Sequence, residues 1–211
     1  MKFKIETNPY GNKKTMFRKK NIEINPGLTV LVGCNGSGKT TLLQQIKKIV
    51  TDKGISCMNY DNVSDNKHNT IADAVYLGNF DIVAQQYCSS EGEGIIQNIG
   101  RLAGQIGNTV AMCKTKDEKE LFILIDAVDS GLSVDAINEI KMDLFDIILE
   151  EPLDVYLIVS ANDYTMVRNE QCFDVYTGNY KSFKDYEDYY KFIMKSRERK
   201  DKRKQIFDQK E

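Results

Sequence analysis

The sequence predicts an α/β fold in which a mostly parallel β-sheet is flanked by helices. Three short apolar runs have the β-branched composition of buried strands, at residues 28–32, 121–125 and 155–159. The first two are followed by stretches, 42–50 and 134–149, whose apolar residues recur every three or four positions, as in amphipathic helices. Strands that alternate with helices are typical of a parallel sheet covered by helices.

The other elements follow from periodicity and turn residues. Ser133 is placed to cap the helix that begins at residue 134. We expect two or three strands within residues 1–32 as an N-terminal antiparallel β portion, because Pro and Gly at 8–11 and 25–27 mark turns. The remaining expected elements are a strand at 55–60, helices at 71–88 and 95–106, a hairpin at 173–183 around the turn 177–179, and a helical, basic C-terminus.

Length and composition indicate one globular domain. The 211 residues are 41% hydrophobic and 28% charged, and no apolar run approaches the roughly 20 residues of a membrane span. The five cysteines are scattered without a C-x-x-C pair, which argues against a zinc site or a disulfide framework. We therefore expect a cytoplasmic protein with no membrane partner. The one histidine, His68, lies among polar residues and is expected to be a solvated loop residue.

A glycine-rich octapeptide, Gly33–Thr40, joins the first buried strand to the first helix and fits the phosphate-loop pattern G-x-x-x-x-G-K-[ST]. Its backbone N–H groups and the helix N-terminus would surround a β-phosphate. Lys39 would reach the β- and γ-phosphates of ATP, and the Thr40 hydroxyl would ligate Mg²⁺. A glycine-rich turn that binds nothing is disfavoured, because strand, glycines, Lys-Thr and helix coincide. The candidate nucleotide-binding residues here are Gly33, Asn35, Gly36, Ser37, Gly38, Lys39, Thr40 and Thr41.

Asp126 directly follows the apolar strand 121–125, which is the Walker B pattern. At the carboxyl end of a parallel strand, its carboxylate would lie beside the phosphate loop and hold Mg²⁺. Asp126 and Thr40 are therefore the candidate metal residues.

Two further segments resemble motifs of the ABC-type ATPases, a superfamily that includes transporter and chromosome-maintenance ATPases. Residues 129–133, Asp-Ser-Gly-Leu-Ser, resemble the D-loop, and residues 89–93, Ser-Ser-Glu-Gly-Glu, resemble the signature motif. The resemblance covers about residues 25–165, and the order of the motifs is its most specific part. It implies an ATP-dependent head-to-tail dimer, in which Ser90 and Gly92 address the nucleotide bound to the opposite subunit.

The spacing indicates a minimal member of this superfamily. Only about 50 residues separate Lys39 from Ser89, which leaves no room for a transporter's helical subdomain, and no heptad run indicates a coiled coil. The chain is in this respect similar to small ATP-binding proteins of bacteria and phages, which implies DNA repair or phage–host conflict as processes. A P-loop GTPase is disfavoured, since no N-K-x-D motif is present, and a kinase would not need the segments at 89–93 and 129–133.

The position after Asp126 departs from the resemblance. ABC-type ATPases have Glu there to polarise the attacking water, whereas this chain has Ala127. A methyl group cannot accept a proton, so we expect ATP binding with very slow hydrolysis. Two origins of this alanine stay open: a natural nucleotide-binding switch, or replacement of Glu that traps the ATP state. The rival to an ATPase is a non-catalytic adaptor in which ATP sets the binding of a nucleic-acid or protein partner.

Other family positions are less sharply defined. Asn162 follows strand 155–159 where the family has its switch histidine; it would contact the γ-phosphate or the lytic water, or be a turn-forming residue. For the Q-loop position Asn62 is better placed than Gln85 or Gln86. Tyr10 and Phe17 are the candidates for stacking on adenine, although each could equally pack in the core.

The C-terminal residues 185–211 are expected to form an aromatic and basic helical tail on an ATPase domain of residues 1–184. Within 195–204, seven basic residues face two acidic ones, a net charge of +5. This run is either a solvated helix face or a contact for a nucleic-acid or protein partner. The apolar and aromatic residues before it recur three and four positions apart, which favours packing on the body over stacking on bases: Tyr186, Tyr189, Tyr190 and Ile193.

Overall fold

The computed structural model describes residues 1–11, 15–61 and 91–208. The expected helix at 71–88 and several single residues singled out from the sequence lie outside this part: Asn62, His68, Gln85, Gln86 and Ser90.

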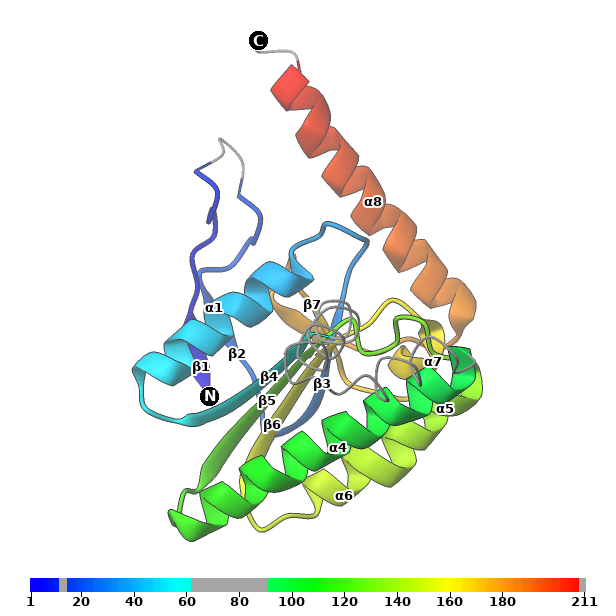
Figure 1. Cartoon of the computed structure of the whole chain (residues 1–211). Helices are drawn as coiled ribbons and strands as arrows, with labels where there is room; N and C mark the ends of the chain where they lie inside the picture. The colour runs from blue at the N-terminus through cyan, green and yellow to red at the C-terminus, as the bar shows by residue number, and fades with distance from the viewer. Residues whose placement is uncertain (12–14, 62–90, 209–211) are drawn as a thin grey trace, which may run out of the picture.

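A six-stranded sheet forms the centre, in the order β4-β5-β6-β3-β7-β8, and its first five strands are parallel (Figure 1). β8 closes one edge antiparallel to β7. The expected hairpin at 173–183 is thereby confirmed, as is the mostly parallel sheet. The strands are β3 (Gly27–Val32), β4 (Ser56–Asp61), β5 (Glu120–Asp126), β6 (Asp154–Ser160), β7 (Cys172–Asp174) and β8 (Asn179–Lys181).

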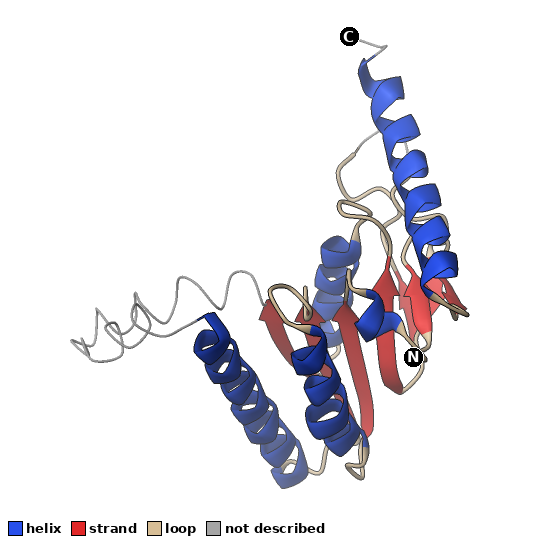
Figure 2. Ribbon diagram, turned by 90° about the vertical axis from the view of Figure 1, so that its right-hand side faces the viewer, coloured by secondary structure: helices blue, strands red, loops and turns tan. Residues whose placement is uncertain are grey.

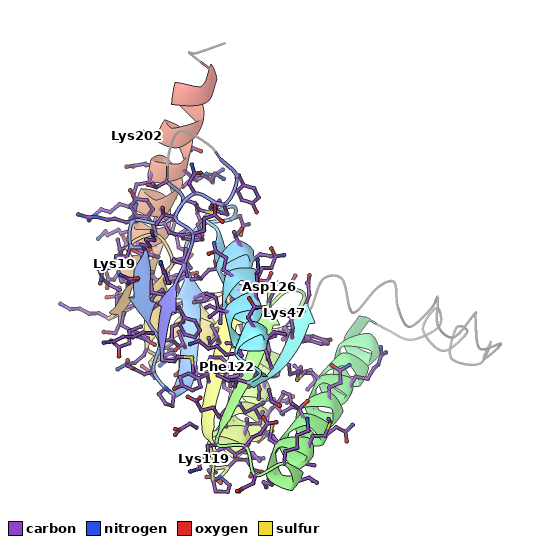
Figure 3. All side chains as sticks on the ribbon, turned by 90° about the vertical axis from the view of Figure 1, so that its left-hand side faces the viewer. Lys19, Lys47, Lys119, Phe122, Asp126 and Lys202 are labelled. Atoms are coloured by element: carbon purple, nitrogen blue, oxygen red, sulfur yellow. The ribbon has the colours of Figure 1, made fainter. Side chains whose placement is uncertain are left out.

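The central strands carry consecutive apolar residues because helices cover both faces of the sheet (Figure 2). Along β5, Leu121, Ile123 and Ile125 belong to one hydrophobic cluster, whereas Phe122 and Leu124 belong to the cluster on the opposite face. Asp126 ends the same strand (Figure 3). The alternation places the polar end of β5 at the rim of the sheet, beyond both apolar layers.

One face carries α1 (Lys39–Asp52) and the N-terminal β portion. β1 (Lys2–Lys4) and β2 (Asn21–Glu23) form a separate antiparallel pair, which confirms the expected N-terminal antiparallel element. Phe3 and Ile22 from these strands are buried in the same cluster as the apolar side of α1.

The other face carries α4 (Glu91–Thr115) and a helical run made of α5 (Val134–Glu139), a π-helical turn (Ile140–Phe145) and α6 (Asp146–Leu149). The Ser133 side chain accepts a hydrogen bond from the Ala136 amide, so the expected cap is present. α4 begins four residues before the expected start and continues beyond residue 106, because Val110 and Cys113 extend its buried stripe.

Two helices complete the described chain. α7 (Tyr164–Val167) is one short turn after β6, and α8 (Tyr186–Asp208) is the expected C-terminal helix. Tyr189 and Phe192 at the beginning of α8 are buried against the body, and the rest of the helix extends away from the sheet (Figure 1). Among the described residues, no helix is long and apolar enough to cross a membrane.

Candidate nucleotide-binding site

The phosphate loop is held in a conformation that two of its glycines make possible. Gly38 has a φ of +106° and caps α1, and a Cβ there would lie 2.7 Å from the Met16 sulfur. At Gly33 a Cβ would lie 2.5 Å from the Ser37 hydroxyl. A side chain at either position would therefore require these neighbours to shift, and at Gly38 the positive φ adds backbone strain. With glycine, the loop closes around the N-terminus of α1, whose free N–H groups favour an anion.

Lys39 crosses the mouth of this loop. Its Nζ donates to the Gly33 carbonyl at 2.8 Å and to Asn162 Oδ1 at 2.9 Å, so the loop and the segment after β6 share one ammonium group. The Lys39 side chain is buried, and this burial lowers its pKa, although the carboxylates of Asp129 and Asp126 oppose the effect. The two neutral oxygens that accept from the ammonium replace only part of the water that it has lost.

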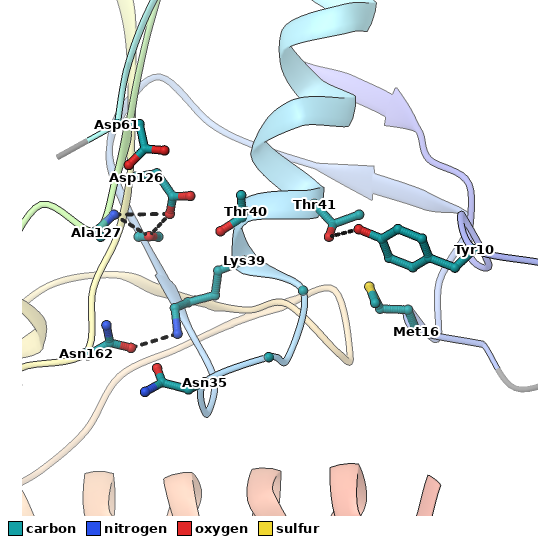
Figure 4. Close-up of a pocket in the computed structure, with 13 residues that line it drawn as sticks. Tyr10, Met16, Asn35, Lys39, Thr40, Thr41, Asp61, Asp126, Ala127 and Asn162 are labelled. Atoms are coloured by element: carbon teal, nitrogen blue, oxygen red, sulfur yellow. Dashed lines mark hydrogen bonds between the residues drawn. The ribbon is translucent and has the colours of Figure 1, made fainter. Parts of the chain in front are cut away.

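Three strand ends bring carboxylates and a hydroxyl to the same rim. Ser160, the last residue of β6, donates to Asp126 Oδ1. The amide of Ala127 donates to the same Oδ1 at 3.1 Å and to Ser160 Oγ at 2.8 Å. Asp61 ends β4 in register with Asp126 and lines the same cavity. Figure 4 shows both carboxylates on the side of the cavity that faces Thr40. Sequence reasoning missed Asp61 and Ser160, whose only signal is their place at the end of a strand.

The cavity between these groups has a volume of about 520 Å³, within the range of small-molecule sites. Most of the residues expected at a nucleotide come together here: Asn35, Gly36, Gly38, Lys39, Thr40, Thr41, Asp126, Ala127 and Asn162. Gly33 and Ser37 lie within the same loop but do not line the cavity. Gly92 lies in the first turn of α4.

The two candidates for stacking on adenine, Phe17 and Tyr10, lie in different environments. Phe17 is 1% exposed and belongs to the core, so stacking on a ligand is wrong for this residue. Tyr10 is 61% exposed, lines the cavity beside Met16, and its hydroxyl hydrogen-bonds with Thr41 Oγ1 at 3.1 Å. The difference arises because Phe17 belongs to the N-terminal apolar layer, where its ring packs closely beside Gly38.

Ala127 lies where the sequence places the missing Glu, next to Asp126 and in the wall of the cavity. Its φ of +51° is in the left-handed region, which is uncommon for residues other than glycine. The bonds from its amide to Asp126 and Ser160, with the Ser130 amide bonded to its carbonyl at 3.0 Å, hold this turn. The side chain at 127 therefore has a fixed direction from the backbone.

Asp129, in the D-loop-like segment, holds the residue that bonds Lys39. Its Oδ2 accepts from the Asn162 amide at 2.6 Å and from the Asp163 amide. The Tyr189 hydroxyl donates to the Asn162 carbonyl at 2.7 Å. Within the described part of the chain, Asp129 Oδ1 is buried without a hydrogen-bond partner. Burial raises the pKa of the Asp129 carboxyl, and the two backbone amides counteract this only in part.

We expect Asp129 to make the protein less stable as the pH rises. Because its folded pKa is raised, the native state holds this proton more tightly than the unfolded chain, whose Asp pKa is about 3.9. The contribution is full below that value and is lost as the pH rises through the folded pKa. Asp129→Asn keeps the oxygen acceptor but removes the titrating proton. The melting temperature of this variant should therefore fall less between pH 4.5 and 8 than that of the wild type. An equal fall in the wild type, the variant and an exposed control, Asp201→Asn, would contradict this assignment.

Comparison with known proteins agrees with this geometry. The family model described as AAA domain matches residues 15–211, which is most of the chain. The comparison with curated proteins gives no match. A phosphate loop at the centre of a parallel sheet, an acidic strand end beside it and this family match lead to one conclusion. The chain belongs to the AAA domain family of P-loop ATPases.

Proposed function

We propose that the protein is a minimal ABC-type ATPase that binds Mg·ATP through Gly33–Thr40. The observation that supports this most strongly is the meeting of Lys39, Thr40 and Asp126 in one cavity at the rim of the sheet. Calorimetry with Mg·ATP tests the proposal: we expect one tightly bound nucleotide per chain and weaker binding when EDTA removes Mg²⁺. Absence of binding heat from a folded sample would contradict it.

The oxygen donors at the rim suit Mg²⁺, which prefers carboxylate, hydroxyl and water ligands and is usually held by only one or two carboxylates together with phosphates. Thr40 and Asp126 would hold it, with Asp61 close enough in register to act through water. When bound, the ion neutralises charge on the β- and γ-phosphates. Lys39 and the amides of the loop would bind the phosphates, and Asn162 would orient the terminal one.

Turnover is expected to be slow, since the cavity wall at 127 offers a methyl group and no carboxylate. The same feature supports a second candidate function, a non-catalytic adaptor that uses ATP to set the binding of a nucleic-acid or protein partner. In that case the basic tail, 195–204 within the proposed C-terminal segment 185–211, would contact the partner, and the protein would act in the cytoplasm. Fast ATP hydrolysis by the Ala127→Glu variant would favour descent from an active ATPase.

ATP should drive formation of a head-to-tail dimer. The motivation is the resemblance of residues 89–93 to the signature motif, which in ABC-type ATPases addresses the nucleotide bound to the opposite subunit. Ser90→Arg should abolish the dimer and leave monomer ATP affinity nearly unchanged. Light scattering with saturating Mg·ATP measures this, with Thr115→Arg at the far end of α4 as the control. A wild-type monomer under these conditions would disprove the dimer.

A further inference from the structure

A second cavity lies on the other side of Asn35 and Asn162 from the nucleotide cavity. Its volume is about 620 Å³, and its walls are the first half of α8, residues 162–165 and the outer side of the phosphate loop. Asn35 and Asn162 belong to both cavities. Neither the resemblance to ABC-type ATPases nor the proposed Mg·ATP site accounts for this second space.

One end of this cavity is aromatic. Tyr186 and Tyr190, one turn apart on α8, are 60% and 47% exposed, and their rings stack with centroids 6.3 Å apart. Tyr164 meets the Tyr186 ring edge-on at 5.7 Å. The expectation that the tyrosines of the tail pack on the body therefore holds for Tyr189, which is 5% exposed, and fails for Tyr186 and Tyr190. The rings of Tyr186 and Tyr190 therefore face solvent at the edge of a cavity that is large enough for a small-molecule ligand.

The other end is cationic. Arg197 and Lys200 follow on the same side of α8, and the Lys200 ammonium donates to the Asn35 carbonyl at 3.0 Å. No carboxylate in the described ranges forms a salt bridge with Arg197. Among the described residues, the lining contains one acidic side chain, Asp163, whose Oδ1 is engaged by the Thr165 amide at 2.7 Å as the cap of α7. The cavity thus has a flat aromatic end and a positively charged end.

We propose that this cavity, the α8 groove, binds a second nucleotide unit, with its base on Tyr186 and Tyr190 and its phosphate at Arg197 and Lys200. Stacked aromatic rings with neighbouring cations are the general means of holding unpaired nucleotides. The volume suits one such unit and is too small for a protein helix. The unit is supplied either by a free nucleotide or by a single strand. This inference rests on the proposed function, in which the first cavity is taken by ATP.

The α8 groove is also connected to the phosphate loop. The Cys34 amide donates to Ser196 Oγ at 3.1 Å in a buried contact, one turn before the Lys200 bond to Asn35. At the aromatic end, Tyr189 donates to the Asn162 carbonyl, and Asn162 in turn accepts from Lys39. A ligand in the groove and ATP in the first cavity therefore act on the same two segments. Their affinities should depend on one another, by the same factor in both directions.

Binding of fluorescein-labelled dT12 and of etheno-AMP, each with a saturating non-hydrolysable ATP analogue, tests the groove. Tyr190→Ala should weaken whichever probe binds by about tenfold or more, the effect of losing one stacking ring, and Tyr190→Phe should restore the affinity. Arg197→Glu should weaken it strongly. Lys202→Glu is the matched control, because Lys202 lies on the same helix (Figure 3) and does not line the cavity.

Each outcome has one meaning. Binding of dT12 that is lost in Tyr190→Ala and Arg197→Glu shows a single-strand site, and the same losses with etheno-AMP alone show a site for free nucleotides. Equal losses in Arg197→Glu and Lys202→Glu with none in Tyr190→Ala would overturn the groove in favour of non-specific attraction to the tail. Binding of neither probe by a chain that still binds ATP would also overturn it. Failure to bind ATP at all would refute the Mg·ATP site instead.

Discussion

The Ala127→Glu variant should hydrolyse ATP about 10²–10⁴ times faster than the present sequence, the usual contribution of a general base. Residue 127 follows Asp126 at the rim and lines the nucleotide cavity. Its amide is bonded to Asp126 and Ser160, so a longer side chain would start from a backbone that is already held. A carboxylate there would orient a water in line with the γ-phosphate. Single-turnover release of phosphate at saturating Mg·ATP measures the effect.

Ala127→Gln is the matched control for this gain. It has nearly the size and shape of Glu, and it begins from the same backbone with φ of +51°, but its amide cannot take the proton. We expect it to bind ATP and to remain as slow as the present sequence. Fast turnover by the present sequence, or no gain in a folded Ala127→Glu protein that binds ATP, would show that the carboxylate belongs at another position.

Lys39→Ala should weaken ATP binding about 10- to 150-fold, the equivalent of a charge-assisted contact of about 1.5–3 kcal/mol. Its stability without ligand should not fall by a comparable amount. The buried ammonium is compensated by two neutral oxygens, of Gly33 and Asn162, and its lowered pKa reflects the cost of burial. Loss of ATP affinity without loss of stability distinguishes a lysine that binds phosphate from a lysine that only supports the fold.

Calorimetry gives the affinity of this variant, and thermal unfolding without nucleotide gives its stability. Lys39→Met is the control for packing, because it keeps an unbranched side chain that is one atom shorter and removes the charge. If the charge of Lys39 binds the phosphates, the ATP affinity of both variants should fall to a similar degree. ATP affinity equal to that of the wild type in either variant would refute the assignment of Lys39.

The sheet could be predicted from the sequence because its central strands are buried on both faces. Continuous apolar runs as short as 121–125 and 155–159 are typical of strands in a parallel sheet that helices cover on both sides. The phosphate loop was equally accessible, because its pattern G-x-x-x-x-G-K-[ST] is contained in eight consecutive residues. In both cases the signal is a short, continuous stretch of sequence.

The rest of the site depends on which strands are neighbours. Asp61 meets Asp126 because β4 pairs with β5, and Ser160 reaches Asp126 because β6 lies between β5 and β3. No local pattern encodes that order. The exposure of Tyr190 likewise depends on where α8 leaves the body of the protein, so its helical spacing alone favoured the wrong environment.

The position of β3 has a consequence for the order in which the protein matures on the ribosome. β3 is made early, yet both of its neighbours, β6 and β7, are made much later. The contact that fixes the Cys34 amide comes from Ser196, 162 positions further along the chain. Such distant pairings are slow to form. We therefore expect a nascent chain to expose its first core strand through most of translation and to gain affinity for ATP only once α8 has emerged.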